Sequence, residues 1–407
     1  MLIYAVAFAV AGATPFILLP VLTKMLTPTE FGKATSFLIL AVMIGNFAGL
    51  SAHGFVAVRY FKSQAAGFRG VVSTSVLYVC GAHALVLALI PALFPWLADW
   101  FGLPASMVLL AVIAALLISL NQIFLAIYQS SGKPMLYLLA RSAQALVEIA
   151  LCVGLLLAVA AESGSRIFSY VIALAASAFI GLRHCRQQGY LGSAMNRTDA
   201  RSLRAFAVPM IPHILAGTAI TYIDRVMVSS ILGVDSLGVY MVGMQIGMAM
   251  SVLIEPMNKA LAPWLFGELA KKDPQVDRRV VRSTYLFYAG LVVAGFIVAL
   301  VSHRLFDFII ASEYADAKAL IPWLVAGFVF QGMYYTVVNY IFYAERSGRL
   351  SAMSTGTAVF GALLSYVLIS RMGMAGAGIS FAITNFSLFA LAWFTASRLV
   401  PMPWLLR

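Results

Sequence analysis

Residues 107–128 read MVLLAVIAALLISLNQIFLAIY, a run that contains no charged side chain. An α-helix needs about 20 apolar residues to cross the hydrocarbon of a bilayer, so this run predicts a membrane-spanning helix. The composition points the same way, because 62% of the 407 residues are hydrophobic and only 10% are charged, against about half and a quarter in soluble proteins. A water-soluble enzyme is therefore excluded.

The apolar runs also exclude a membrane β-barrel, whose strands alternate apolar and polar residues. We predict an all-α, polytopic membrane protein with about twelve transmembrane helices, each an apolar run of about 17 to 25 residues. The predicted spans lie near residues 2–23, 31–50, 71–95, 107–128, 136–158, 166–182, 208–231, 237–258, 284–302, 319–342, 352–370 and 375–396.

Basic residues set the expected orientation, because Lys and Arg concentrate in cytoplasmic loops. Twenty of the 27 basic residues come shortly after an even-numbered span or in the C-terminal tail, and six belong to the opposite side. This bias predicts that both termini are cytoplasmic. The net charge of +12 then reflects topology and contact with anionic membrane lipid, and we expect no nucleic-acid partner.

The chain divides near its midpoint into two halves. The segment LTPTEFG (26–32) joins the first two spans, and LGVDSLG (232–238) joins the seventh and eighth spans with the same Leu, acidic-residue and Gly framing. Two halves with six spans each are related by an axis along the membrane normal, a frame used for alternating access. We predict an N-terminal six-helix lobe at 1–182, a basic cytoplasmic linker at 183–207, a C-terminal six-helix lobe at 208–396 and a cytoplasmic tail at 397–407.

The short external loops argue against an enzyme. A membrane-embedded synthase or ligase should carry catalytic side chains in a substantial loop, and the sequence contains neither a Ser/His/Asp arrangement nor a metal-ligand spacing. The sequence therefore predicts a transporter with no catalytic residue, no metal site and no cofactor.

Ionisable side chains inside the spans are the candidate functional residues, because each costs at least about 2.5 to 3.5 kcal/mol at the bilayer centre. Glu148 lies midway along the fifth span, and Arg141, Gln144 and Glu148 share one helical face by their i, i+3, i+7 spacing. We expect this stripe to face the inside of the bundle. It is either a packing network within the helix or a cavity-lining site with a protonatable carboxylate.

Asp224 and Arg225 lie in the outer half of the seventh span. Adjacent residues point about 100° apart on a helix, so each is expected to need its own partner. Pro209 and Pro212 can kink the same span near the inner surface. The two charged residues serve either gating and substrate binding or pairing between helices.

Two further candidates lie at the inner ends of spans. Arg59 follows the second span and either snorkels into the headgroups or binds a phosphate, which suits a bidentate guanidinium. Glu255 precedes Pro256 at the end of the eighth span. It is either a helix-end carboxylate or a coupling residue.

Several motifs together resemble one family. They are the run through Pro20 into LTPTEFG, residues 49–59, Pro209 with Asp224-Arg225, LGVDSLGVY, and Glu313-Tyr314-Ala315. With these motifs nearly the whole chain resembles the polysaccharide biosynthesis proteins, which are O-antigen and lipid-linked oligosaccharide flippases of the multidrug/oligosaccharidyl-lipid/polysaccharide exporter superfamily. The resemblance implies two six-helix lobes around a central cavity. It also implies transfer of an undecaprenyl-diphosphate-linked oligosaccharide, such as an O-antigen unit of lipopolysaccharide, to the periplasmic leaflet of a bacterial inner membrane.

By motif position, the resemblance implies that Arg59 and Arg225 meet the diphosphate, and we expect Arg141 to assist them. Asp224 or Glu148 would serve coupling or gating, with Glu255 as a further candidate, and the coupling ion would be H⁺ or Na⁺. Membrane lipid and proteins of glycan polymerisation or assembly are the other expected partners.

Two alternative functions stay open. A cation-coupled multidrug exporter of the same superfamily should need acidic more than basic cavity residues. A membrane glycan polymerase or ligase should have an essential residue in an external loop.

Overall fold

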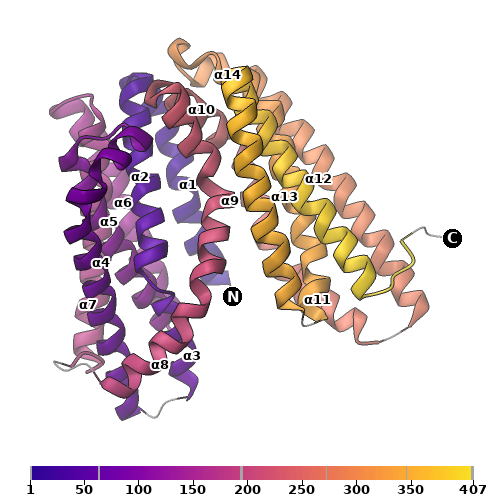
Figure 1. Ribbon diagram of the computed structural model, residues 1–407, viewed down its shortest axis with the longest axis horizontal. Helices are drawn as coiled ribbons and strands as arrows, with labels where there is room; N and C mark the ends of the chain where they lie inside the picture. Colours follow the sequence, from indigo (N-terminus) through magenta and orange to yellow (C-terminus); the bar gives the residue numbers. More distant parts are fainter. Residues whose placement is uncertain (1, 63–64, 193–195, 272, 345, 405–407) are drawn as a thin grey trace. The chain divides into compact units, whose positions relative to one another are not determined.

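The computed structural model describes residues 2–62, 65–192, 196–271, 273–344 and 346–404. Every element within these ranges is a helix, so the predicted all-α membrane fold is confirmed, while the number of spans and the orientation of the termini stay predictions. In chain order the elements are α1 (Leu2–Met25), α2 (Pro28–Ala48), α3 (Ala52–Lys62), α4 (Ala65–Phe101), α5 (Ala105–Ser130), α6 (Pro134–Ala158), α7 (Ser163–Gln187), α8 (Arg197–Ala207), η1 (Val208–Met210), α9 (Ile211–Leu232), α10 (Val234–Gly247), α11 (Ala249–Leu269), α12 (Pro274–Ile309), η2 (Ser312–Tyr314), α13 (Ala317–Tyr343) and α14 (Ser347–Leu399) (Figure 1).

Nine helices of the described chain are long and apolar enough to cross a membrane, and α10 with α11 forms a pair bent by 43° that would make one more span. The 53-residue α14 is interrupted by Gly373, whose φ is 59°. The Ser365 hydroxyl donates to the Ser380 hydroxyl over 3.2 Å, although fifteen residues of straight helix would separate them by about 22 Å. The chain therefore turns back at Gly373, where the sequence also places the division between the last two spans.

The described chain forms two compact units. Unit 1 contains Met1–Thr218 and Gly233–Gly238, and unit 2 contains Ala219–Leu232 and Val239–Arg407. The segment 183–207, predicted as a linker, holds the end of α7 and all of α8, and both belong to unit 1. The predicted tail at 397–407 extends three residues beyond the described part of the chain.

The core of unit 1 gathers side chains from α3, α4, α5, α7 and α8. The short α8 buries Ala200, Leu203 and Ala207, whose i, i+3, i+7 spacing puts them on one face. Figure 1 shows α8 beside α3 at one end of this unit, and the Phe55 and Phe206 rings lie 5.9 Å apart there. Apolar packing of this face explains why an arginine-rich segment becomes a docked helix.

The core of unit 2 gathers side chains from α11, α12, α13 and α14. Polar groups within it bond across helices, as membrane helices often do. The Tyr288 hydroxyl lies 2.7 Å from the Thr336 hydroxyl, and the Asn339 amide donates to Asn258 over 3.0 Å. These bonds connect α12 and α11 to α13.

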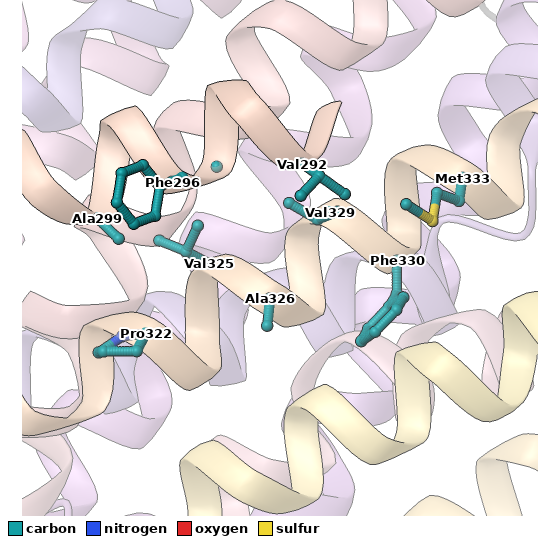
Figure 2. A pocket seen from close by; sticks show the side chains of 10 residues that line it. Val292, Phe296, Ala299, Pro322, Val325, Ala326, Val329, Phe330 and Met333 are labelled. Atoms are coloured by element: carbon teal, nitrogen blue, oxygen red, sulfur yellow. The ribbon is translucent and has the colours of Figure 1, made fainter. Parts of the chain in front are cut away.

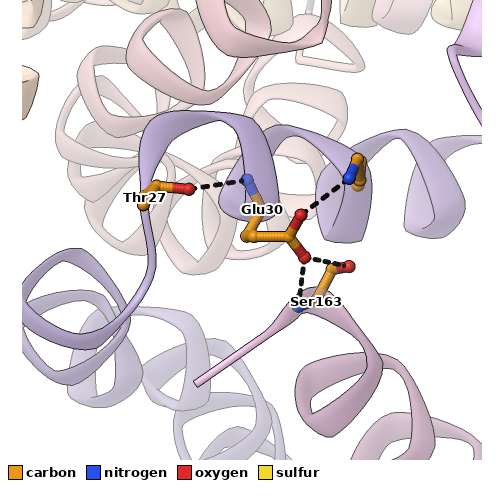
Figure 3. Close-up of polar contacts among 4 residues, drawn as sticks. Thr27, Glu30 and Ser163 are labelled. Carbon is orange, nitrogen blue, oxygen red and sulfur yellow. Dashed lines mark hydrogen bonds and ion pairs between the residues drawn. The ribbon is translucent and has the colours of Figure 1, made fainter. Parts of the chain in front are cut away.

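Glu30 joins the start of α2 to the start of α7. The Thr27 hydroxyl caps α2 by accepting from the Glu30 N–H. The Glu30 carboxylate then accepts from the Ser163 N–H at 2.8 Å and the Ser163 hydroxyl at 2.6 Å, and it contacts the Lys33 ammonium at 2.7 Å (Figure 3). The Glu30 carboxylate thus binds the Ser163 N–H, one of the first N–H groups of α7 that have no partner within the helix.

The two copies of the repeated motif meet inside unit 1. A Cβ atom on Gly32 would collide with the Val234 carbonyl oxygen, and a Cβ atom on Gly238 would collide with the Pro28 carbonyl oxygen. Pro28 and Val234 hold the same place in LTPTEFG and LGVDSLG, as do Gly32 and Gly238. The contact is therefore reciprocal, and only glycine lets the two backbones approach so closely.

Candidate functional site

Glu148 forms a buried ion pair with Arg166. Glu148 lies on α6 and Arg166 lies near the start of α7, and its Oε1 is 2.7 Å from the arginine Nη1. Each residue is only 6% exposed. The guanidinium also lies 6.0 Å from the centre of the Tyr170 ring. Each buried charge thus touches an opposite charge, as burial of ions requires.

Arg141 lies on the same helix as Glu148 but does not form this pair. Seven residues of α-helix span about 10.5 Å, so the two side chains are a long way apart along α6. Arg141 is half-buried, and its Nε has no hydrogen-bond partner among the described residues. The neutralising charge for Glu148 comes from α7 instead.

Asp224 has a partner on another helix. It lies on α9 and is 3% exposed, and Tyr240 on α10 is completely buried. The Tyr240 hydroxyl donates to the Asp224 Oδ2 over 2.5 Å. This short bond to a charged acceptor is of the strong kind. Asp224 therefore has a partner of its own, as the sequence predicts.

Arg225 is buried but loosely paired. Its Nη1 is 3.6 Å from the Asp224 Oδ1, which is beyond hydrogen-bond distance for a charge-assisted pair. Its guanidinium lies 5.2 Å from the centre of the Tyr222 ring. Arg225 is 6% exposed, and within the described chain its Nη1 has no hydrogen-bond partner. The residue therefore has donor capacity that the protein does not use.

Arg59 lies in the last turn of α3, where a cation is favoured by the helix dipole. The bend before this helix holds Leu50 and Ser51 at φ of 51° and 49°, values that cost energy for residues other than glycine. Arg59 is half-buried, and its guanidinium lies 5.4 Å from the centre of the Phe55 ring.

Glu255 is exposed on α11, directly before Pro256. The proline has no N–H, so it interrupts the backbone ladder of the helix at this point. Glu255 therefore differs from Glu148 and Asp224, whose carboxylates are buried.

The six predicted residues are distributed over both units. Arg59, Arg141 and Glu148 belong to unit 1, and the contiguous Asp224-Arg225 pair and Glu255 belong to unit 2. Among the described residues, the ion pairs join only Asp224 and Arg225 from this set.

Sequence reasoning missed two partners. Arg166 is the first residue of the predicted span 166–182, a position where an arginine can also snorkel into the headgroups, so the sequence alone does not reveal that it is buried. Tyr240 ends the motif LGVDSLGVY, and nothing in the sequence distinguishes it from an interfacial aromatic residue.

The cavity between α12 and α13 in unit 2 has a different character. It has a volume of about 340 Å³, and Phe296, Val325, Phe330 and Met333 are among its lining residues, all of which are apolar (Figure 2). A charged head group would lose its hydration there without compensation. As for metals, the described part of the chain contains no group of three or more His, Cys, Asp or Glu residues that could hold an ion.

The fold is that of membrane transporters. The lipid II flippase MurJ in an inward closed conformation has a TM-score of 0.77 at 13% identity, covering 97% of this chain and 87% of that one. An inward-facing multidrug resistance MATE family transporter of the MOP superfamily has a TM-score of 0.73 at 12% identity, covering 97% and 94%. The protein is a multi-pass membrane protein with this architecture.

Sequence comparison identifies the family. Residues 2–267 match the sequence profile of the polysaccharide biosynthesis proteins, and the chain belongs to that family. An uncharacterized membrane protein of Haemophilus influenzae is 23% identical over 356 residues, covering 86% of this chain and 85% of its own. A second protein of that species, Lsg locus putative protein 1, is 22% identical over 149 residues, or 37% of each chain. The resemblance inferred from the motifs is confirmed.

Proposed function

We propose that the protein is a flippase that moves an undecaprenyl-diphosphate-linked oligosaccharide across the bacterial inner membrane by alternating access. The observation that carries the proposal is Arg225, a buried arginine inside an apolar helix with an unused guanidinium donor. A diphosphate sugar cannot cross hydrocarbon unaided, so its carrier must supply polar, cationic groups. A guanidinium suits a diphosphate because it can donate two parallel hydrogen bonds.

The other candidate residues have proposed roles of their own. Arg59 and Arg141 are the further cations proposed for the diphosphate. Glu148 and Asp224 are proposed to serve coupling or gating with H⁺ or Na⁺ as the driving ion, and Glu255 is a third coupling candidate. Proteins of glycan polymerisation or assembly would receive the translocated product.

The alternative of a cation-coupled multidrug exporter has weaker support from these side chains. A binding site for organic cations needs a carboxylate with free acceptor capacity. In the described chain, Arg166 contacts Glu148 and Tyr240 donates to the Asp224 Oδ2, while the Asp224 Oδ1 has no hydrogen-bond partner and lies 3.6 Å from the Arg225 Nη1. The free acceptor of Asp224 thus has the Arg225 cation beside it, an arrangement that favours an anionic over a cationic substrate.

A glycan polymerase or ligase also has weaker support. The connections between helices on the predicted external side are short: residues 26–27 between α1 and α2, Gly102–Pro104 between α4 and α5, residues 159–162 between α6 and α7, Gly233 between α9 and α10, and residues 310–316, with η2, between α12 and α13. Such turns offer little room for an external catalytic site. We therefore infer that the protein transports and does not catalyse.

The test is complementation of a strain that lacks this gene, with surface glycan and lipid-linked intermediates as the readouts. Arg225→Gln is expected to abolish glycan display while the protein still inserts, because the substrate head loses its cation. Arg225→Lys is expected to retain part of the activity, since an ammonium keeps the charge but not the planar fork.

The control is Arg186→Gln, which removes an exposed arginine of α7 and should leave glycan display unchanged. Normal display by both Arg225→Gln and Arg59→Gln variants would contradict the assignment of the site. Loss of drug resistance without loss of glycan would instead support the exporter.

A further inference from the structure

Tyr240, Asp224 and Arg225 lie close together within unit 2. The two residues are neighbours on α9, and the Asp224 Oδ1 lies 3.6 Å from the Arg225 Nη1. The other carboxylate oxygen, Oδ2, accepts from the Tyr240 hydroxyl on α10 at 2.5 Å. The carboxylate is thus bonded to the tyrosine and only near the arginine.

The hydrogen bond between Tyr240 and Asp224 is buried, which makes its loss costly. Asp224 is 3% exposed and Tyr240 is 0% exposed, so water has little access to either group. A charge-assisted hydrogen bond is about twice as strong as a neutral one, and a buried carboxylate oxygen that loses it must find another donor. The nearest cation is Arg225, and closing the gap to about 2.8 Å would complete an ordinary ion pair.

An arginine that forms a direct ion pair with a carboxylate binds a second anion poorly. The substrate phosphate would have to break the pair before it could bind, whereas the open arrangement leaves the Nη1 donor unused. The Tyr222 ring, 5.2 Å from the guanidinium, provides an aromatic face for the cation without using its hydrogen-bond donors.

We propose that Tyr240 is a positioning residue, which holds Asp224 away from Arg225 and so keeps the guanidinium available to the diphosphate of a polyprenyl-linked substrate. This inference rests on the proposed function. It adds that the affinity of the site depends on a hydroxyl that does not itself touch the substrate.

The experiment measures binding of undecaprenyl diphosphate to the full-length protein in nanodiscs, with undecaprenyl monophosphate as the comparison ligand. Tyr240→Phe is expected to weaken diphosphate binding about tenfold, because Asp224 closes on Arg225. Asp224→Asn is expected to bind at least as tightly as the wild type. The double variant Tyr240→Phe/Asp224→Asn should recover wild-type binding, because no carboxylate is left to occupy the arginine.

Tyr128→Phe is the matched control. Tyr128 is also fully buried, and its hydroxyl has no hydrogen-bond partner within the described residues. Its loss should change neither binding nor the unfolding temperature. This control separates the removal of a bonded hydroxyl from the general effect of placing phenylalanine in the core.

The outcomes distinguish this inference from the function on which it rests. Weak binding by Arg225→Gln together with wild-type binding by Tyr240→Phe would refute only the positioning role. Weak binding by Tyr240→Phe that Asp224→Asn does not restore would also refute it, since the tyrosine would then act through packing. Wild-type binding by Arg225→Gln would refute the proposed diphosphate site itself.

Discussion

Two buried acid–base pairs of this protein differ in how closely their charges approach each other. In unit 1, Glu148 and Arg166 come from two helices and touch at 2.7 Å. In unit 2, Asp224 and Arg225 are neighbours on one helix and remain 3.6 Å apart, while Tyr240 binds the carboxylate. The two arginines are equally buried.

The difference is the reason that the proposed ligand role is given to Arg225 and not to Arg166. A direct pair between helices uses both charges to hold the helices together, so Arg166 stabilises α6 against α7. In the second pair the tyrosine binds one carboxylate oxygen of Asp224, and Arg225 stays 3.6 Å from the other oxygen. Burial alone would rank the two arginines as equals, and only their partners distinguish them.

The largest effect is expected from Arg166→Ala. It leaves Glu148 buried without a counter-charge, which should cost about 3 to 5 kcal/mol of unfolding free energy. Unfolding of the purified protein by denaturant measures the loss. Arg186→Ala, which changes an exposed arginine on the same helix, is the control. Equal stability of these two variants would mean that the pair does not hold the helices together.

A smaller loss of stability is expected from Arg225→Gln. Asp224 keeps its bond to Tyr240, so the cost should be about 1 to 3 kcal/mol, even though transport is lost. The same unfolding measurement applies. A loss as large as that of Arg166→Ala would show that Asp224 depends on Arg225, and the contrast between the two pairs would disappear.

The smallest effect is expected from Arg141→Gln. Arg141 is half-buried and belongs to no ion pair in the described chain, so its stability change should stay within about 0.5 kcal/mol. Unfolding and glycan display are measured together. A large loss of stability would mean that Arg141 belongs to a polar network with Glu148. Unchanged glycan display would mean that Arg141 does not bind the substrate.

The sequence predicts those structural features that depend on the residues of a single helix. The apolar runs predict the long helices, and the glycines after Arg371 predict a turn that the structure has at Gly373. The burial of Glu148 follows from its place in the middle of a span. In α8 the spacing of Ala200, Leu203 and Ala207 is likewise a signal carried by one helix, within the segment 183–207 that is predicted as the linker.

Partners on other helices could not be predicted in the same way. Arg141 shares a face with Glu148, yet about 10.5 Å of helix lies between them, and the arginine that reaches the carboxylate belongs to α7. Likewise, the 100° between adjacent residues predicts that Asp224 needs its own partner, but it does not point to Tyr240.

The sequence by itself determined that this is a membrane protein of many helices, because apolar length and the cost of burying charge are local properties of a segment. It also determined which charged residues must be accounted for inside the spans. The tertiary structure decided which partner each of those charges meets. That outcome depends on distances of a few ångströms between side chains, and the difference between 2.7 and 3.6 Å separates an arginine in direct contact with its carboxylate from one that is only near it.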